Sequence, residues 1–240
     1  MERHEERSFM NRTSHELSSR RAAMSAGTAI LLGYFSIAIA FGVSGRSIGL
    51  PAVAVAGFSV FVFAGASQFV AVGLLAQGAG ALSIIAATLV LNSRHIVMSM
   101  SLRDRIVGSR IPRPVLAFGI TDEVFTAAAT RPGEIQDTDL LVSEALAYSG
   151  WIGGTVVGFL IGSVLPSVME DAMGIALYAM FVALIVPAVL RFPRYLVPAL
   201  AAGGCNWALQ AIGVPVGIAL LVSIGAVAAL FAVSPRWSES

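Results

Sequence analysis

Polar and ionisable side chains interrupt an apolar run at residues 81–102. Asn92, Arg94 and His95 follow a stretch of aliphatic residues in this run. A charged group at the centre of a bilayer costs ~2.5–3.5 kcal/mol on insertion scales, so such groups are retained for a pathway, a partner or a binding site. Two interpretations stay open: the residues form a transport site, or Arg94 extends to the cytoplasmic surface while His95 is a hydrogen-bonded core residue. On a helix the polar residues form one stripe: Thr88, Asn92, His95 and Ser99.

An acidic pair, Asp122 and Glu123, stands in a second and weaker apolar run at residues 114–130. Carboxylates in an apolar setting can bind an ammonium group, take up a proton during a transport cycle, or pair with Arg94. The alternative is a surface helix with both acids in solvent, because the run is barely long enough to cross a bilayer.

Small residues and an amide lie between aromatic residues at positions 63–69. A helix broken here would expose the N–H groups of a half-helix N-terminus, which favour a carboxylate, so we take Gly65, Ser67 and Gln68 as candidate site residues. The alternative is that these small residues serve close helix packing.

Glycines recur every fourth residue in the run at 140–165. A line of residues without side chains lets another helix approach closely, so it predicts packing against a helix of this chain or of a second subunit. Glu144 is on a different line of the same helix, near its end, and we expect it to reach water. The packing line consists of Gly150, Gly154, Gly158 and Gly162.

The elements that carry these residues belong in a bilayer. Hydrophobic residues make up 57% of the 240 residues and charged residues 12%, which leaves too little polar surface for a water-soluble domain. We therefore predict an all-α, polytopic membrane helix bundle with six to eight hydrophobic segments, some of them broken or re-entrant helices. The apolar runs lie at 22–43, 51–77, 81–102, 114–130, 140–165, 172–190, 195–212 and 215–233.

The arginines constrain the topology. We expect residues 1–21 to be a charged cytoplasmic tail and residues 22–240 to form a single transmembrane domain. If every run crossed once, the arginine-rich loop at 103–113 would lie outside, against the positive-inside rule. The conflict disappears if 51–77 enters and returns and 114–130 also fails to cross. A tilted single helix at 51–77 is the alternative.

Several function classes are excluded by residue type. All fifteen basic residues are arginine, so a P-loop and a pyridoxal phosphate site both lack their lysine, and ATP is not expected as a partner. Cys205 is the single cysteine, and no Cys or His spacing indicates a metal site. The net charge of +1 argues against nucleic acid. We expect no cofactor and no enzymatic activity.

Four segments together resemble a known family. Residues 33–42, 63–69, 92–95 and 121–125 are similar in order and spacing to the AzlC family, the large subunit of bacterial branched-chain amino-acid exporters. The family usually has proline where Ser36 stands and leucine where Ser93 stands. The resemblance implies a small AzlD-type membrane subunit as partner and export driven by an ion gradient.

These observations combine into a functional hypothesis, an inner-membrane permease with a cytoplasmic N-terminus that exports a neutral aliphatic amino acid. Its zwitterionic substrate needs one cationic and one anionic contact. Arg94 or the turn at 65–68 would bind the carboxylate, Asp122 or Glu123 the ammonium, and the Asn92 and His95 stripe would form the pocket wall or a proton relay. The alternatives are a passive channel for small polar solutes and a non-transporting membrane assembly protein.

Overall fold

The computed structural model describes residues 2–162, 182, 186, 189–190 and 193–233. Apart from four positions, the apolar run expected at 172–190 lies outside the described residues. In chain order the elements are α1 (Glu2–Ser47), α2 (Ala52–Phe61), α3 (Gly65–Ala76), α4 (Ala81–Leu102), β1 (Ile106–Val107), α5 (Arg113–Gly119), α6 (Asp122–Ala129), β2 (Ile135–Gln136), α7 (Asp137–Ile161), η1 (Pro193–Tyr195), α9 (Leu196–Ala211) and α10 (Val216–Val233).

The described part of the chain is helical apart from two strands of two residues each. Three of its helices are long and apolar enough to cross a bilayer: Leu17–Ser47, Ala81–Leu102 and Asp137–Ile161. The chain therefore has the composition and secondary structure of a helical membrane protein. The number of crossing segments stays a prediction.

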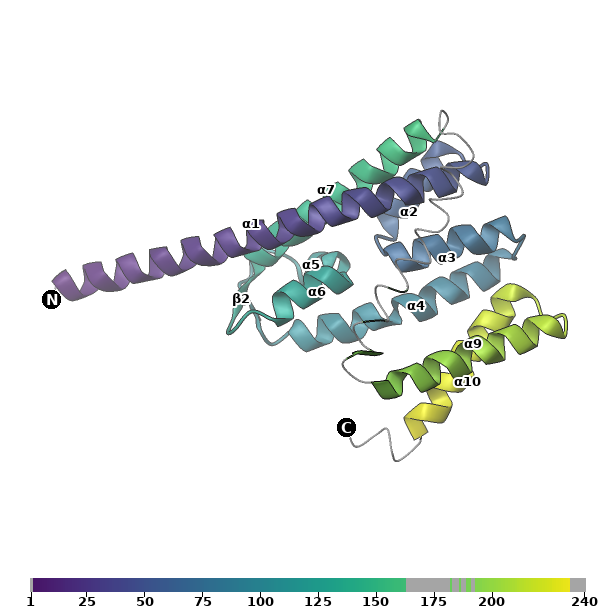
Figure 1. Cartoon of the computed structure of the whole chain (residues 1–240). Coiled ribbons are helices and arrows are strands. Elements are labelled where there is room, and N and C mark those ends of the chain that lie inside the picture. The colour runs from purple at the N-terminus through teal and green to yellow at the C-terminus, as the bar shows by residue number, and fades with distance from the viewer. Residues whose placement is uncertain (1, 163–181, 183–185, 187–188, 191–192, 234–240) are drawn as a thin grey trace.

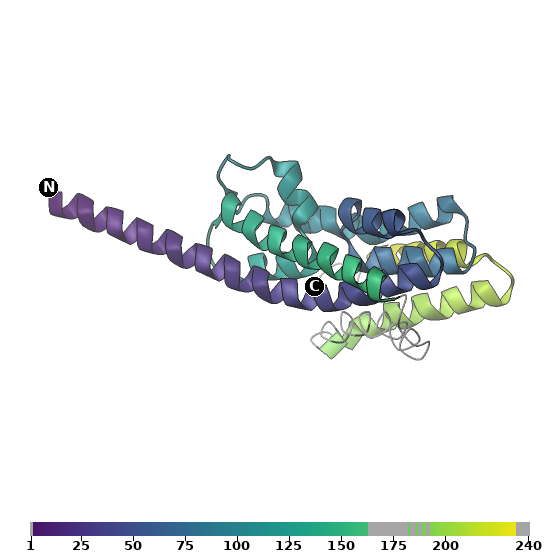
Figure 2. The same ribbon diagram turned by 90° about the horizontal axis from the view of Figure 1, so that it is seen from above.

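The two longest helices, α1 and α7, lie side by side and run parallel (Figures 1 and 2). The predicted glycine line of α7 faces α1 of the same chain, where a Cβ atom would overlap backbone atoms of the neighbouring helix. Glycine there lets the two backbones touch, which favours association where lipid supplies no hydrophobic driving force. The facing pairs are Gly150 with Leu31, Gly154 with Phe35 and Gly158 with Ile39, and Gly162 lies beside Val43 and Arg46.

Helices α2 and α3 form a broken hairpin rather than one tilted helix. The helix ends at Phe61 and restarts at Gly65, and Phe63 between them has a positive φ of 41°. Helix α2 starts at the same end of the molecule as the C-terminus of α1, and α3 returns to that end before joining α4 (Figure 1).

Helices α5 and α6 form a second hairpin, which enters from the opposite end (Figure 1). Its two ends are held together because β1 pairs in parallel with β2, with Ile106 opposite Ile135. The Arg105 guanidinium adds bonds to the carbonyls of Ala129 and Gly133, at 3.1 and 3.0 Å. This hairpin therefore returns to the end at which it started.

The remaining elements lie at the two extremes of the chain. Helix α1 begins at Glu2, so it continues through the segment expected to be a charged tail, whose sequence has no apolar stripe. Helices α9 and α10 pack on each other, and α10 also packs on α4 (Figure 1). Other faces of α4 carry exposed apolar residues such as Leu82 and Val97.

Candidate functional site

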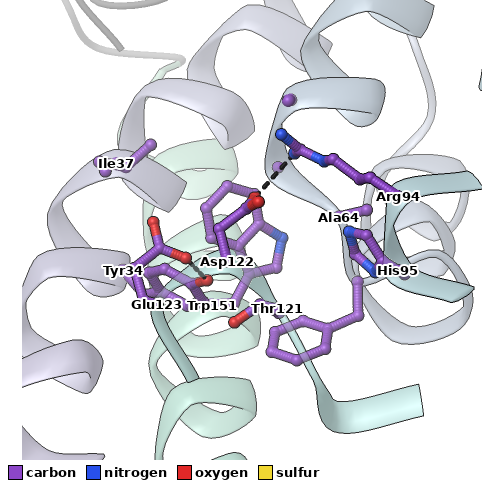
Figure 3. A pocket seen from close by; sticks show the side chains of 12 residues that line it. Tyr34, Ile37, Ala64, Arg94, His95, Thr121, Asp122, Glu123 and Trp151 are labelled. Atoms are coloured by element: carbon purple, nitrogen blue, oxygen red, sulfur yellow. Dashed lines mark hydrogen bonds and ion pairs between the residues drawn. The ribbon is translucent and has the colours of Figure 1, made fainter. Parts of the chain in front are cut away.

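The breaks of the two hairpins meet at one pocket, which is completed by α1, α4 and α7 (Figure 3). The volume of this pocket is about 40 Å³, which holds a few water molecules at ~10–15 Å³ each and is far below the ~300–1,000 Å³ of pockets that enclose a small molecule. The pocket is therefore narrow in this conformation. Its lining consists of Tyr34, Ile37, Phe63, Ala64, Gly65, Ala66, Arg94, His95, Thr121, Asp122, Glu123 and Trp151.

The pocket lies far from the nearest described ends of the two long helices α1 and α4. At ~1.5 Å per residue, Tyr34 is about 20 Å along α1 from Ser47. By the same rise, Arg94 is about 20 Å from Ala81 and about 12 Å from Leu102 along α4. In a helix that crosses a bilayer, whose hydrocarbon core is ~30 Å thick, positions this far from the helix ends lie within the core.

An ion pair joins α4 to the α5–α6 hairpin across this pocket. Arg94 Nη2 of α4 lies 2.8 Å from Asp122 Oδ2 at the start of α6, and the two side chains are 39% and 31% exposed (Figure 3). The Arg94 head group therefore points to a partner in the pocket rather than along α4 to the surface. In this structure Asp122 pairs with Arg94, which is one of the three roles that the sequence left open for this carboxylate.

The second acid of the pair has a separate partner. The Tyr34 hydroxyl of α1 donates a hydrogen bond to Glu123 Oε2 (Figure 3). Asp122 and Glu123 occupy the first turn of α6, where the N–H groups favour negative charge, and the Thr121 hydroxyl caps this turn by accepting a bond from Val124 N. Both carboxylates are thus placed at one helix start and tied to two different helices.

Polar atoms without a hydrogen-bond partner gather in the pocket. Within the described residues they include Arg94 Nε, His95 Nε2 and Trp151 Nε1, each buried and unbonded. Buried polar atoms in native structures are nearly always bonded to protein or water, so these atoms are available to a water molecule or to a ligand. The Asn92 Oδ1 atom is also buried and unbonded, but Asn92 does not line the pocket.

The rest of the lining is apolar and aromatic. The rings of Tyr34 and Trp151 meet edge to face at 5.4 Å, and Phe63 packs in the same manner on Tyr148 at 4.9 Å. A Cβ atom at Gly65 would lie 2.7 Å from the Trp151 ring, so the start of α3 fits against this ring only as glycine.

Ser67 and Gln68 lie behind the pocket rather than in its wall, and both are fully buried. The Gln68 amide accepts a bond from Ala64 N and donates one to Ser59 Oγ, both at 3.3 Å. Ser59 in turn shares a hydrogen bond of 2.7 Å with Thr155 of α7. This network supports the break between α2 and α3.

Of the site candidates taken from the sequence, five line the pocket and Ser67, Gln68 and Asn92 do not. The five are Gly65, Arg94, His95, Asp122 and Glu123. Three polar residues of the lining were not considered as site residues from the sequence. One of them stands within the family-like segment at 33–42 and one directly precedes the acidic pair, but neither position was weighed as a site. The missed residues are Tyr34, Thr121 and Trp151.

The expectation for Glu144 is wrong. Its side chain is 3% exposed, and Glu144 Oε1 and Oε2 are both buried without a hydrogen-bond partner among the described residues. The expectation rested on its distance from the helix end, but α5 covers this part of α7, and the carboxyl group lies directly against Gly119.

Comparison with known proteins places these residues in a shared region. A family model described as AzlC protein matches residues 29–165. An uncharacterised membrane protein of Archaeoglobus fulgidus is 39% identical over 129 residues, which cover 54% of this chain and 56% of that protein. The inner membrane protein YgaZ of Escherichia coli is 33% identical over 135 residues, covering 54% of this chain and 55% of YgaZ.

A relative with a transport name matches at lower identity. The branched-chain amino acid transport protein AzlC of Bacillus subtilis is 27% identical over 152 residues, covering 62% of this chain and 60% of that protein. The chain thus spans little more than half the length of the curated relatives it matches. No solved structure matches it.

The matched region contains both broken hairpins and every residue that lines the pocket, from Tyr34 to Trp151. The family model covers more than half of the chain, and the resemblance inferred from the four sequence segments is confirmed by it. The chain belongs to the AzlC family.

Proposed function

We propose that the chain is a membrane permease that exports a neutral aliphatic amino acid through the pocket between its two broken hairpins. The observation that carries this proposal is the Arg94–Asp122 ion pair, which joins a cation and an anion in an otherwise mostly apolar pocket. A zwitterion needs both charges at close range, and an aliphatic side chain needs an apolar wall.

Binding would occur by exchange of partners. The substrate carboxylate takes the place of Asp122 at the Arg94 guanidinium, and its ammonium group takes the place of Arg94 at Asp122 or Glu123. The unbonded Arg94 Nε and Trp151 Nε1 supply further donors for the carboxylate. The first N–H groups of α3 begin at Gly65 in the pocket wall and favour the same negative group.

The arginine distribution supports an orientation. Arg105 and Arg110 lie at the end where α5–α6 enters, and Arg131 donates a hydrogen bond to Ser19 O, so the start of the apolar part of α1 lies at that end too. By the positive-inside rule this end is cytoplasmic, as is the N-terminus. Arg191 and Arg236, which entered the same argument, lie outside the described residues. We assign the chain to the bacterial inner membrane.

A partner subunit also belongs to the proposal. We propose that a small AzlD-type membrane protein assembles with the chain. The support is family membership together with the exposed apolar residues of α4, among them Leu89, Ile96 and Met100, which need lipid or protein as cover.

The test measures amino-acid efflux from cells loaded with dipeptides of leucine, isoleucine, valine or methionine. Cells that contain the chain, alone or with an AzlD-type protein, are expected to lower their internal amino-acid content below the concentration of the same amino acid added to the medium, whereas cells without it do not. Arg94→Ala is expected to abolish this efflux while the protein stays in the membrane. Arg103→Ala, at an exposed position near the end of the same helix, is the matched control.

Two outcomes would replace the proposal. Fast equilibration without movement against a gradient indicates a passive channel. Unchanged efflux in cells that lack the chain, together with loss of another membrane protein, indicates an assembly role. Normal efflux by Arg94→Ala removes the ion pair from the mechanism.

A further inference from the structure

Glu144 is a buried acidic residue that does not line the pocket. It lies on α7 one turn before Tyr148 and two turns before Trp151, so at ~1.5 Å per residue it is about 10 Å from the pocket wall. The same distance separates it from Asp137, where α7 begins. It therefore stands midway between the pocket and the arginine-rich end of the molecule.

The surroundings of Glu144 offer no compensation for a negative charge. Both carboxyl oxygens are buried and unbonded within the described part of the chain, and the side chain is 3% exposed. An isolated carboxylate in such a place carries a desolvation cost so large that the group binds a proton instead. In this conformation Glu144 is therefore a neutral carboxylic acid.

Ionisable groups on the helices around α7 are committed to other partners. Tyr34 of α1 bonds to Glu123 of α6, and Asp122 of α6 pairs with Arg94 of α4. Other groups bond to the backbone or lie on the same helix. These are Arg113 of α5, which donates to Ile106 O, Arg46 of α1, which donates to Phe159 O, Tyr148 of α7, which donates to Val60 O, and Asp139 of α7, which accepts from Ser19.

The contact with Gly119 links the charge of Glu144 to the position of a hairpin. A Cβ atom at Gly119 would lie 2.5 Å from Glu144 Cδ and 2.6 Å from Oε2, so the carboxyl group fills the space that the glycine leaves. Gly119 is the last residue of α5 and lies two residues before Thr121, the cap of α6. Movement of α5 away from α7 would uncover the carboxyl group to water.

We propose that Glu144 is the proton-binding site through which a proton gradient drives this permease. The proposal rests on the proposed function and names its coupling ion. With the proton bound, α5–α6 packs on α7 and keeps Asp122 and Glu123 in the pocket. Release of the proton leaves a carboxylate that requires water, so the hairpin separates from α7. The pocket then opens toward the arginine-rich end, because Glu144 lies on that side of it.

The proton balance of this cycle is simple. Each cycle moves one proton, which Glu144 binds when it is reached from the side of the pocket opposite the arginine-rich end, and which it releases at the arginine-rich end when the hairpin separates from α7. No bond other than the carboxyl O–H forms or breaks. The neutral form permits the closed hairpin, and the charged form favours the open one, which is the two-state behaviour that coupling requires.

The test uses the full-length chain in proteoliposomes, with its small partner where activity requires one, and radiolabelled leucine. Glu144→Gln keeps the size of the side chain and fixes it in the neutral form. We expect leucine uptake driven by an imposed pH gradient to fall at least tenfold, while leucine–leucine exchange without a gradient is retained. Glu134→Gln, at an exposed position, is the matched control and should retain both activities.

Each result decides a different point. Absence of leucine exchange by the unmodified protein overturns the proposed function itself. Exchange without any response to a pH gradient, or a Glu144→Gln variant with normal gradient-driven uptake, overturns the role of Glu144 alone. If Glu144→Gln loses both activities, the pH profile of transport is measured for Glu144→Asp, which keeps an ionisable carboxyl group. A shifted pH profile of transport supports the proton site, and an unchanged profile overturns it.

Discussion

The two broken hairpins bring different chemistry to the same pocket. The break in α2–α3 is neutral, and the Gln68, Ser59 and Thr155 side chains that support it are at most 1% exposed. The break in α5–α6 is charged, and its Asp122 and Glu123 side chains bond to α4 and α1. One break is held from behind by a buried amide network, and the other is held across the pocket by charges.

This difference separates a support role from a binding role. A buried network of neutral groups contributes to stability only while every member is bonded, so its loss affects folding first. A partly exposed ion pair contributes little to stability, and its groups stay available to a charged ligand. We therefore expect variants at the first break to lower stability and variants at the second break to lower transport.

The largest effect is expected for Asp122→Asn. The amide keeps the shape of the side chain but loses the charge that pairs with Arg94 and would hold a substrate ammonium group. Because charge-assisted hydrogen bonds contribute ~1.5–3 kcal/mol, leucine transport should fall about tenfold to a hundredfold. Asp104→Asn, at an exposed position, is the control. Transport at the unmodified rate would remove the charge from the mechanism.

The next effect is expected for Gln68→Ala, and it is an effect on stability. The change leaves Ala64 N without its side-chain partner and removes one of the two bonds of Ser59 Oγ, which keeps its bond to Thr155, at a cost of ~1–3 kcal/mol. For a chain of this size that corresponds to a decrease in Tm of roughly 2–12 °C, measured by thermal unfolding in detergent.

The control for this experiment is Gln77→Ala on the same helix, since its exposed amide bonds only to its own helix at Gly73 O. Transport per correctly folded molecule should stay within about twofold of the unmodified protein, an energy of ~0.4 kcal/mol. A Gln68→Ala variant with normal Tm and no transport would reverse the roles of the two breaks.

Much of the charged break could be predicted from the sequence. Arg94 and Asp122 are conspicuous because ionisable residues are rare in apolar runs, so residue type alone identifies them as partners of something. Ser93, in contrast, stands beside Arg94 in the sequence but is exposed and bonds only to Val90 O. Adjacency to Arg94 in the chain therefore does not by itself place a side chain in the pocket.

The contacts that support the neutral break and the burial of Glu144 were harder to predict, and both for the same physical reason. The supporting contact of Ser59 with Thr155 joins residues far apart in the chain, and Glu144 is buried because α5 folds over it. The residue pattern within one helix does not show which other helix packs against it. The glycine line of α7 likewise indicates close packing without naming α1, because many helices can fill the same groove.

A third effect is expected for Gly65→Ala, which tests whether the neutral break also shapes the pocket. The added methyl group would lie 2.7 Å from the buried Trp151 ring, which cannot withdraw without disturbing Tyr34 and Phe41. We expect leucine transport to fall about tenfold, corresponding to ~1.4 kcal/mol. Gly73→Ala on the same helix meets nothing within 4 Å and should have no effect.

A second variant strengthens this test. Combining Gly65→Ala with Trp151→Phe makes room for the methyl group, and part of the lost transport should return. If Gly65→Ala alone is as active as the unmodified protein, the start of α3 is not a wall of the binding pocket, and only the charged break remains there.

The smallest effect is expected for Thr121→Ala at the charged break. Loss of an N-cap costs ~0.5–2 kcal/mol, and the low end applies here because the bond from Val124 N to Thr121 Oγ1 is 3.5 Å long. Tm should fall by roughly 2 °C and leucine transport by at most about threefold, since Asp122 and Glu123 keep their partners on α4 and α1. Thr121→Ser retains the hydroxyl and should match the unmodified protein in both measurements. A Thr121→Ala variant that loses as much transport as Asp122→Asn would mean that the cap, rather than the ion pair, holds α6 at the pocket, so that both breaks would depend on neutral hydrogen bonds.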